Sequence, residues 1–557
     1  MRIPFSPWPE SAASEYRDKG YWTGETIHSL LASRAKTTPD AIAIVCGKRR
    51  INYAEFYSLV NRLSIAFAKK RLGPKDTAVI HLTNTFEFYL AFFALLKRGV
   101  TPVLALAAHR YSELSHYLSQ TNAKLLISDG DIWGKQCSEM MQRLQAEHSD
   151  LAQIVMTNSL QDMPDFVTDF NSLTSEDDSI HGDLGLPNEV AFFQLSGGST
   201  GTPKLIPRTH DDYLYSVRES SKICQLNEQS RYLCALPVGH NFSLSSPGAL
   251  GIFYAGGTVV LAKDPSPDTC FSIIEAEKIN ITALVPPVAM VWMKSAERNA
   301  KSLASLKLLQ VGGAKFSQEA AKKVEPLLGC KLQQVFGMAE GLVNYTRIDD
   351  SSEIIENTQG RPISDDDEIL VLDDNDEPVA RGEIGHLLTR GPYTFRGYFQ
   401  APVTNSKSFT ADGFYRTGDI VRQTADGYLI VEGRHKDQIN RGGEKIAAEE
   451  IENHLIAFDG VLDVALVAMP DELMGEKSCA FLIPEDVNIP VIKLRQFLRQ
   501  RGLADYKIPD RFEFVPVFPK TAVGKVSKKQ LRLQIIDILK GSHKLSLQSF
   551  TDSAVSK

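Results

Sequence analysis

The sequence predicts an α/β protein with a large first domain and a smaller second one. Up to about residue 350, short apolar runs of strand type alternate with stretches that carry apolar residues at helical spacing. That order is typical of parallel sheets with helices on both faces. Between about 366 and 433, short strands alternate with Gly, Asp and Asn turns, which predicts an antiparallel β subdomain. The polar run 433–437 precedes a new α/β pattern, so we expect domains of residues 1–433 and 434–557.

The individual elements follow from the apolar pattern along the chain. Helical spacing predicts helices over 26–36, 53–72 and 86–96, and the last is short enough to be a buried helix and not a membrane span. The predicted strands cover 41–45, 79–82, 99–103, 125–127, 154–156, 190–195, 232–236, 258–261, 283–285, 308–311, 369–372 and 428–431. Most of the later strands end near Gly or Pro with polar residues, where open α/β sheets bind ligands.

Composition narrows the class of protein. The 557 residues are too many for one core, and 43% hydrophobic with 23% charged residues is ordinary for a soluble globular protein. A formal net charge of -7 suggests no general attraction to nucleic acid or to anionic membranes. The seven cysteines are scattered without a C-x-x-C pair, so we expect reduced thiols in a cytoplasmic protein and no zinc site.

The segment Ser196–Lys204 is the stretch around which the chain is organised. It follows the apolar run Val190–Leu195 and holds three glycines and four hydroxyl residues. Such a loop can close its backbone N–H groups and hydroxyls around phosphate oxygens, with Lys204 adding a positive charge. It is not a Walker A motif, which needs a different spacing. A Ser/Gly-rich surface loop is the alternative interpretation.

Three further segments carry residues that suit a nucleotide. Gln334–Glu340 places an aromatic residue, a turn glycine and a carboxylate after a strand, which suits purine stacking and Mg²⁺ bound to phosphates. Tyr415–Asp419 places an acidic residue after a tight turn, where it could accept hydrogen bonds from ribose hydroxyls. Gly312–Lys315 permits close approach of a flat ligand. Taken singly, each has an ordinary structural explanation as a buried aromatic, a hairpin loop or a turn.

Together and in this order, these segments resemble the adenylate-forming superfamily, which includes acyl- and aryl-CoA synthetases, luciferases and nonribosomal adenylation domains. The resemblance covers nearly the whole chain and extends to Gly433–Lys436, Asn440–Lys445 and Pro519–Lys525. It implies the adenylate-forming enzyme fold: an N-terminal domain of two α/β subdomains and a β subdomain, and a small mobile α/β C-terminal domain. It also implies ATP and Mg²⁺.

The resemblance assigns a role to each matched residue. Phe336 would lie on the adenine, Glu340 would bind Mg²⁺, and Asp419 would hold the ribose with Arg434 nearby. The catalytic residues would be Lys525, Glu340 and His240. The ATP-binding residues would be Ser196, Gly197, Gly198, Ser199, Thr200, Gly201, Lys204, Gly312, Val335, Phe336, Gly337, Asp419 and Arg434.

A charge argument supports the role of Lys525. When a carboxylate attacks the α-phosphorus of ATP, two anions meet and negative charge builds on the phosphate oxygens, which fixed cations stabilise. The alternative is a solvated lysine in a basic tail, since Lys520, Lys528 and Lys529 are close in sequence.

The acid to be activated is indicated by His240–Gly248, a polar segment that follows a strand. A fatty-acid tunnel would be apolar, whereas a small hydroxylated ring needs a few polar anchors in a short apolar pocket. The segment resembles the pocket loop of the 2,3-dihydroxybenzoate–AMP ligases of catechol siderophore synthesis. That resemblance implies that Asn241 meets the ortho-hydroxyl side of the acid. The aryl-acid-binding residues would be His240, Asn241, Phe242, Ser246, Gly313, Ala314 and Val343.

Fine substrate preference depends on a few positions within this pocket. Salicylate-activating relatives tend to have Cys in place of Ser246 and Leu in place of Val343, so the residues present here fit a second ring hydroxyl. Two positions depart from the usual pattern: Phe242 replaces a Tyr of some relatives, and Ser243 replaces the usual Pro.

The resemblance also implies a second step and a partner. Lys436 would be a hinge about which the C-terminal domain rotates, presenting Gly442–Lys445 to a phosphopantetheine arm. We expect the arm to belong to an aryl carrier protein on a separate chain, with no nucleic acid or membrane as partner. Coenzyme A as acceptor, salicylate as acid, and a non-catalytic protein that binds ATP or an aryl acid are the alternatives.

Overall fold

A computed structural model describes the chain over residues 3–158, 163–173, 183–196, 203–313, 315–316, 318–373, 375–434, 438–485, 489–519, 526 and 528–552. These residues form two compact units. Residues up to 196 and from 204 to 434 belong to the first, and those from 438 onward belong to the second. The predicted domain boundary at 433/434 falls beside residues 435–437, which lie outside the described ranges.

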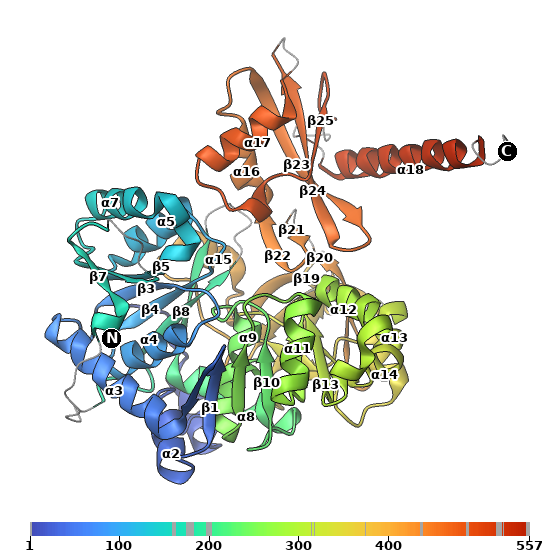
Figure 1. Cartoon of the computed structure of the whole chain (residues 1–557). Coiled ribbons are helices and arrows are strands. Elements are labelled where there is room, and N and C mark those ends of the chain that lie inside the picture. Colours follow the sequence, from blue (N-terminus) through green and yellow to red (C-terminus); the bar gives the residue numbers. More distant parts are fainter. Residues whose placement is uncertain are drawn as a thin grey trace. The chain divides into compact units, whose positions relative to one another are not determined.

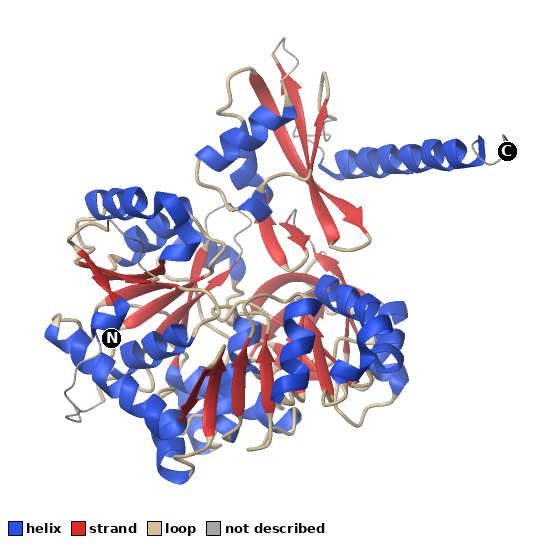
Figure 2. Ribbon diagram, in the orientation of Figure 1, coloured by secondary structure: helices blue, strands red, loops and turns tan. Residues whose placement is uncertain are grey.

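The largest sheet of the first unit has parallel strands at its centre and antiparallel strands at its edges (Figure 2). In spatial order it consists of β16 (Arg361–Pro362), β15 (Val343–Tyr345), β14 (Lys331–Gly337), β13 (Leu308–Gly312), β12 (Ile281–Leu284), β10 (Arg231–Cys234), β11 (Thr258–Leu261), β1 (Ile42–Cys46) and β2 (Arg49–Asn52). The carboxyl ends of β10, β12, β13 and β14 therefore meet at one edge.

A second sheet of the same unit is also mostly parallel, with an antiparallel final strand. It consists of β7 (Val167–Asp169), β6 (Gln153–Thr157), β5 (Leu125–Asp129), β3 (Thr77–His81), β4 (Thr101–Ala105), β8 (Val190–Ser196) and β9 (Lys204–Thr209). Strands β3, β4 and β5 are buried along their whole length, as parallel strands covered by helices on both faces are. The prediction of an α/β protein with parallel sheets is confirmed.

Helix α4 (Phe86–Lys97) packs between the two large sheets. It contacts β3 and β4 of one sheet and β1 of the other, while α5 (Tyr111–Thr121) and α7 (Cys137–Glu147) lie on the far side of the second sheet (Figure 1). All of its residues except Glu87 are buried. A helix that is apolar all round has to be covered on every side, so the predicted buried helix is confirmed.

The first unit contains further α-helices on and around the two sheets. They are α1 (Glu10–Asp18), α2 (Ser29–Thr37), α3 (Tyr53–Lys69), α5 (Tyr111–Thr121), α6 (Gly130–Trp133), α7 (Cys137–Glu147), α8 (His210–Ile223), α9 (Asn241–Ser245), α10 (Gly248–Ala255), α11 (Pro267–Glu277), α12 (Pro286–Asn299), α13 (Gln318–Leu328), α14 (Ser352–Asn357) and α15 (Pro402–Ser408). Several begin with a side-chain cap: the Asn52 amide accepts from the N–H of Glu55 at the start of α3, and Ser266 caps α11 ahead of a proline.

The β subdomain is an antiparallel sheet of β17 (Glu368–Leu372), β18 (Ile384–Arg390), β19 (Tyr415–Gln423) and β20 (Leu429–Arg434). This confirms the antiparallel region predicted from the turn residues between 366 and 433.

The second unit has its own core around a sheet in the order β22 (Glu444–Ala447), β21 (Gln438–Arg441), β24 (Gly475–Pro484) and β23 (Val461–Asp471), with β25 (Arg511–Phe514) also paired to β24. Helices α16 (Ala448–Leu455), α17 (Val491–Gln500) and α18 (Lys528–Asp552) complete it. In neither unit do the described residues include a helix long and apolar enough to span a bilayer.

A buried ion pair fixes the junction of β9 and α8. Arg208 donates from Nε and Nη2 to Asp212 Oδ1 at 2.9 and 2.7 Å, and the two side chains are 2% and 0% exposed. Asp212 Oδ2 accepts the backbone N–H of Thr209 at 2.8 Å, which closes a capping box at the start of α8.

We expect Asp212→Ala to destabilise the first unit by about 3–5 kcal/mol, because it leaves the Arg208 charge buried without a partner. The four tryptophans all lie in this unit, so tryptophan fluorescence during urea unfolding reports on it alone. The matched control is Glu219→Ala in the same helix, which breaks the more exposed pair with Lys222 and should cost no more than about 1 kcal/mol. Equal shifts in the two variants would contradict this expectation.

Candidate active site

The predicted phosphate loop is the connection of a β-hairpin. Strand β8 ends at Ser196, strand β9 begins at Lys204, and these two residues are paired in antiparallel register. The hairpin therefore brings Ser196 and Lys204 to the carboxyl end of β8, the end at which parallel sheets bind ligands. The five predicted residues between them, Gly197, Gly198, Ser199, Thr200 and Gly201, lie outside the described residues.

A tyrosine that the sequence did not single out joins two of the predicted residues. The ammonium group of Lys204 lies 4.8 Å from the centre of the Tyr398 ring, within the range of a cation–π contact. The Tyr398 hydroxyl donates to Glu340 Oε1 at 2.8 Å. The structure thus brings Lys204, at the mouth of the predicted phosphate loop, and the predicted metal ligand Glu340 to one side chain.

The hydroxyl of Tyr398 is part of a buried hydrogen-bonded chain. Its single hydrogen goes to Glu340, so the 2.9 Å contact with the Tyr415 hydroxyl requires Tyr415 to donate. Burial and the adjacent Glu340 carboxylate hold the pKa of Tyr398 well above its usual value. Tyr398 is therefore a permanent donor that fixes one oxygen of Glu340.

Glu340 lies in the turn between β14 and β15, and that turn is held from outside the sheet. The backbone carbonyl of Glu340 accepts the N–H of Phe395 at 2.8 Å, and the carbonyl of Ala339 accepts from Arg208 Nη1 at 2.5 Å. Gly341 has a φ of 154° in close contact with Thr394, and a Cβ placed on it would lie 2.5 Å from Thr394 Cα. Only glycine fits there without a shift.

The second oxygen of Glu340 is the one suited to a ligand. Oε1 is engaged by Tyr398, whereas Oε2 accepts no hydrogen bond from any residue that the structure describes. Glu340 as a whole is only 5% exposed, and a carboxylate oxygen that no protein group engages can accept a cation. One carboxylate together with phosphate oxygens is a usual set of ligands for Mg²⁺, so Glu340 fits a magnesium ion that arrives with a nucleotide.

The predicted ribose residues lie opposite each other on neighbouring strands. Asp419 of β19 and Arg434 of β20 are paired in the antiparallel register. Asp419 is 3% exposed, and its backbone N–H donates to Thr417 Oγ1 at 3.0 Å. Tyr415, which belongs to the Tyr398 chain, lies on the same strand. Strand β19 therefore holds both Asp419 and Tyr415, and Tyr415 is linked to Glu340 through Tyr398.

Hydrogen bonds at the start of α9 hold the predicted aryl-acid residues Asn241 and His240 in place. The Asn241 side-chain oxygen accepts from the Tyr213 hydroxyl at 2.8 Å, which the sequence did not predict. His240 precedes the helix, is exposed, and its Nδ1 accepts the N–H of Phe242 at 3.3 Å. The structure thus gives His240 a capping role beyond the catalytic one expected from the sequence.

The rest of the predicted pocket lies on three adjacent strands. Phe242 packs against Gly312 at the end of β13, where an added Cβ would lie 3.2 Å from the aromatic ring. The register places Gly312 beside Val335 of β14, and Val335 beside Tyr345 of β15. The same ladder makes two further pairs: Phe336 with Asn344, whose amide donates to the Phe336 carbonyl at 3.0 Å, and Gly337 with Val343.

Ser246 and Gly313 complete the described part of this pocket. Ser246 is 4% exposed and lies beside the buried Tyr345 hydroxyl, and Gly313 has a φ of 84° directly after β13. Ala314, the predicted hinge residue Lys436 and the catalytic candidate Lys525 lie outside the described residues, so their roles stay predictions.

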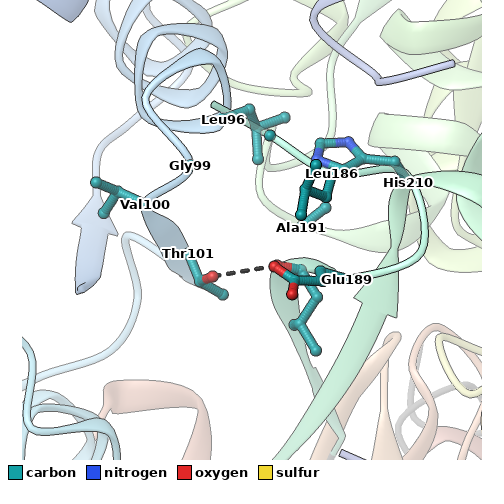
Figure 3. A pocket seen from close by; sticks show the side chains of 10 residues that line it. Leu96, Gly99, Val100, Thr101, Leu186, Glu189, Ala191 and His210 are labelled. Carbon is teal, nitrogen blue, oxygen red and sulfur yellow. Dashed lines mark hydrogen bonds between the residues drawn. The ribbon is translucent and has the colours of Figure 1, made fainter. Parts of the chain in front are cut away.

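A small cleft is visible elsewhere on the second sheet (Figure 3). It has room for about one water molecule and is lined by Leu96, Thr101 and His210 among others. The Thr101 hydroxyl donates to the carbonyl of Val190 at 3.1 Å. Because Thr101 and Val190 begin β4 and β8, this cleft lies at the amino ends of the strands, opposite to Ser196, and is not the candidate active site.

Comparison with known proteins identifies the family. A model of the AMP-binding enzyme family matches residues 31–399. The chain belongs to the AMP-binding enzyme family. A model of the AMP-binding enzyme C-terminal domain matches residues 450–525. The predicted membership of the adenylate-forming superfamily, with a large N-terminal and a small C-terminal domain, is confirmed.

Individual members of the AMP-binding enzyme family are similar to this chain over nearly its whole length. It is 52% identical over 540 residues to the 2,3-dihydroxybenzoate-AMP ligase of Bacillus subtilis, with 96% of this chain and 98% of that protein covered. It is 50% identical over 535 residues to the vibriobactin-specific 2,3-dihydroxybenzoate-AMP ligase of Vibrio cholerae, with the same coverage of 96% and 98%. The apo structure of Mycobacterium smegmatis MbtA matches with a TM-score of 0.73 at 41% identity, covering 95% of this chain and 98% of that one.

We expect Tyr398→Phe to weaken the binding of ATP in the presence of Mg²⁺ by about tenfold, because a hydrogen bond to a charged group contributes roughly 1.5–3 kcal/mol. Isothermal titration calorimetry measures the affinity. The matched control is Tyr428→Phe, which removes a hydroxyl that donates to another carboxylate, Asp350 Oδ1, at 2.5 Å. Equal weakening in both variants, or none in either, would contradict the role given to Tyr398.

Proposed function

We propose that this enzyme activates 2,3-dihydroxybenzoate with ATP, forming an aryl-adenylate and pyrophosphate. It then transfers the aryl group to the phosphopantetheine thiol of an aryl carrier protein in siderophore biosynthesis. The observation that carries this proposal is the identity of about half of all residues, over nearly the full length, with two proteins named as 2,3-dihydroxybenzoate-AMP ligases. The proposal extends their activity to this chain.

At the nucleotide end, the described residues suit ATP with Mg²⁺. Members of the family use ATP, and the Lys204 ammonium, Glu340 Oε2 and the Asp419 carboxyl group supply a cation, a metal ligand and a ribose acceptor. When bound, Mg²⁺ neutralises phosphate charge. Tyr398 orients Glu340, and the aromatic ring of Phe336 is half-buried on the neighbouring strand β14, where it suits the adenine.

At the acid end, the pocket combines a few polar groups with apolar walls. Asn241, fixed by Tyr213, offers its amide N–H group toward an ortho-hydroxyl, and Ser246 offers a second hydroxyl. Val343 and Phe242 supply the apolar surface. This balance suits a small hydroxylated ring better than an alkyl chain.

The proposed chemistry proceeds in two transfers. The carboxylate oxygen of the acid attacks the α-phosphorus, a new P–O bond forms, and the bond to the bridging oxygen of pyrophosphate breaks. The carrier thiol then attacks the acyl carbon and AMP leaves with the oxygen that joined them. In the first transfer Lys525 offsets the negative charge that builds on the phosphate oxygens, and Lys436 is the hinge for the second.

The acceptor, the acid and the class of protein each have an alternative. We propose a carrier protein on a separate chain as acceptor, with coenzyme A as the alternative, and a cytoplasmic location. Salicylate is the alternative acid. A non-catalytic protein that binds ATP or an aryl acid is the alternative of a different class.

Magnesium-dependent ATP–pyrophosphate exchange with added acids tests the proposal. We expect the strongest exchange with 2,3-dihydroxybenzoate and weaker exchange with salicylate, because a missing hydroxyl leaves a polar group unpaired at roughly 1–3 kcal/mol. Offering coenzyme A or a phosphopantetheinylated carrier to the product then separates the two acceptors. Equal or faster exchange with salicylate would refute the acid assignment, and ATP binding without exchange for any aryl acid would refute catalysis.

We expect Lys525→Ala to lower exchange by about 100- to 1000-fold, the usual loss for one preorganised charge contact. Thioester formation from separately supplied aryl-adenylate should stay near wild type if Lys525 serves only the first transfer. Lys520→Ala is the matched control, with the same charge change five residues earlier. Loss of both half-reactions in Lys525→Ala would contradict a domain rotation between the steps.

A further inference from the structure

The buried hydroxyl of Tyr393 bridges a pocket residue and a carboxyl group. It accepts the backbone N–H of Val343 at 3.1 Å and lies 2.6 Å from Asp367 Oδ2, to which it donates its hydrogen. Tyr393 is 0% exposed. The three groups come from β15, from the loop before β17 and from the segment after β18, so the bridge crosses between two sheets.

Val343 depends on this bridge because the sheet does not supply all of its hydrogen bonds. Its carbonyl accepts the N–H of Ile363 at 3.1 Å, while its own N–H donates to Tyr393 and not to a neighbouring strand. Val343 is 4% exposed, and a buried N–H needs a partner. The side chain of Tyr393 therefore completes the backbone of a strand only three residues long.

The backbone around Tyr393 is held at three consecutive carbonyls. Gly391 accepts from Trp8 Nε1 at 3.2 Å, Pro392 from Trp22 Nε1 at 3.1 Å, and Tyr393 from Arg208 Nη2 at 3.0 Å. All three donor side chains are buried. Because these hydrogen bonds hold the backbone of Tyr393 in place, its hydroxyl stays at a fixed position and restrains Val343.

Asp367 holds the other side of the hydroxyl. Its Oδ2 also accepts the N–H of Ser364 at 3.2 Å, and its Oδ1 is buried without a hydrogen-bond partner among the described residues. Burial raises the pKa of Asp367 to about 8, against the opposing effect of the Tyr393 hydrogen bond. The 2.6 Å contact with Asp367 takes the Tyr393 hydrogen in preference to the 3.4 Å contact with the Val343 carbonyl. Tyr393 therefore offers the Val343 N–H a lone pair, which is what that donor requires.

We infer that Tyr393, held by Asp367, is a positioning residue that sets the preference of the enzyme between aryl acids through the backbone of Val343. The inference rests on the proposed function, since it takes Val343 as part of the wall that faces the second ring hydroxyl. Losing the bridge frees Val343 to move within the pocket while the Lys204–Tyr398–Glu340 contacts stay intact. The effect should therefore appear in the binding and discrimination of the acid and not in the handling of ATP.

Steady-state ATP–pyrophosphate exchange with Tyr393→Phe tests the inference. We expect the KM for the preferred acid to rise about tenfold, as for a buried N–H left without its partner. The preference for 2,3-dihydroxybenzoate over salicylate should fall by a similar factor, while kcat and the KM for ATP stay within about twofold. Tyr215→Phe is the matched control, because it removes another buried phenol hydroxyl that donates to Ser364 Oγ at 2.6 Å, in the same loop as Asp367.

Several results would overturn the inference. Unchanged acid KM and preference in Tyr393→Phe would do so, as would equal losses in the KM for ATP, in kcat and in the Tyr215→Phe control. A second pair of variants probes Asp367. Asp367→Asn keeps an acceptor for the Tyr393 hydroxyl, so it should retain the wild-type KM for the acid. Asp367→Leu removes that acceptor and should raise this KM as much as Tyr393→Phe does. Wild-type acid KM in Asp367→Leu would also contradict it. Failure of the proposed function is distinguishable, because the wild-type enzyme would then show no exchange with either acid.

Discussion

The hydrogen bond from Tyr398 to Glu340 is the constraint on which the candidate active site depends. Three sheets contribute to it: Lys204 begins β9, Glu340 lies in the turn between β14 and β15, and Tyr415 begins β19. Apolar packing joins the three sheets at this place, since one core cluster includes Ile206 of β9, Met338 beside the turn and Tyr415 of β19. Apolar contacts have no direction of their own. The buried phenol of Tyr398, which belongs to the same cluster, supplies that direction, because it donates to one side chain, accepts from another and lies beneath the third.

The turn between β14 and β15 serves both ends of the proposed reaction. Glu340 lies in the turn and Val343 begins the strand that follows it. Arg208 contributes to both, since it donates to the carbonyls of Ala339 and Tyr393. Because these buried polar groups are paired, the turn has one well-defined geometry. The proposed metal ligand and the proposed wall of the acid pocket, only three residues apart, are thus held by separate side chains.

Local sequence pattern predicts the elements of this fold well. The predicted strand 258–261 coincides with β11, and the predicted helix from Phe86 differs from α4 by one residue at its end, because continuous burial leaves an unbroken apolar run. The loop after the strand 190–195 also follows from its Gly and Ser residues. Short stretches of sequence determine such features, whereas the antiparallel pairing with β9 and the pairing of Asp419 with Arg434 appear only in the structure.

The supporting residues could not be predicted in the same way. Tyr398 is 58 positions from Glu340, and Tyr393 is 50 from Val343, so no spacing along the chain marks either contact. In the sequence both tyrosines look like ordinary core residues, and only the three-dimensional packing shows which groups their hydroxyls contact. His240 was predicted as a catalytic residue from its motif, whereas its capping bond to Phe242 depends on where α9 begins.

A double-mutant cycle on Tyr398 and Glu340 tests the central claim most directly. The cycle compares the rate of ATP–pyrophosphate exchange in Tyr398→Phe, in Glu340→Gln and in the double variant. If Tyr398 acts by orienting Glu340, its loss should cost nothing further once Glu340 is changed, which corresponds to a coupling energy of about 1 kcal/mol or more. Independent losses that multiply in the double variant would contradict the account.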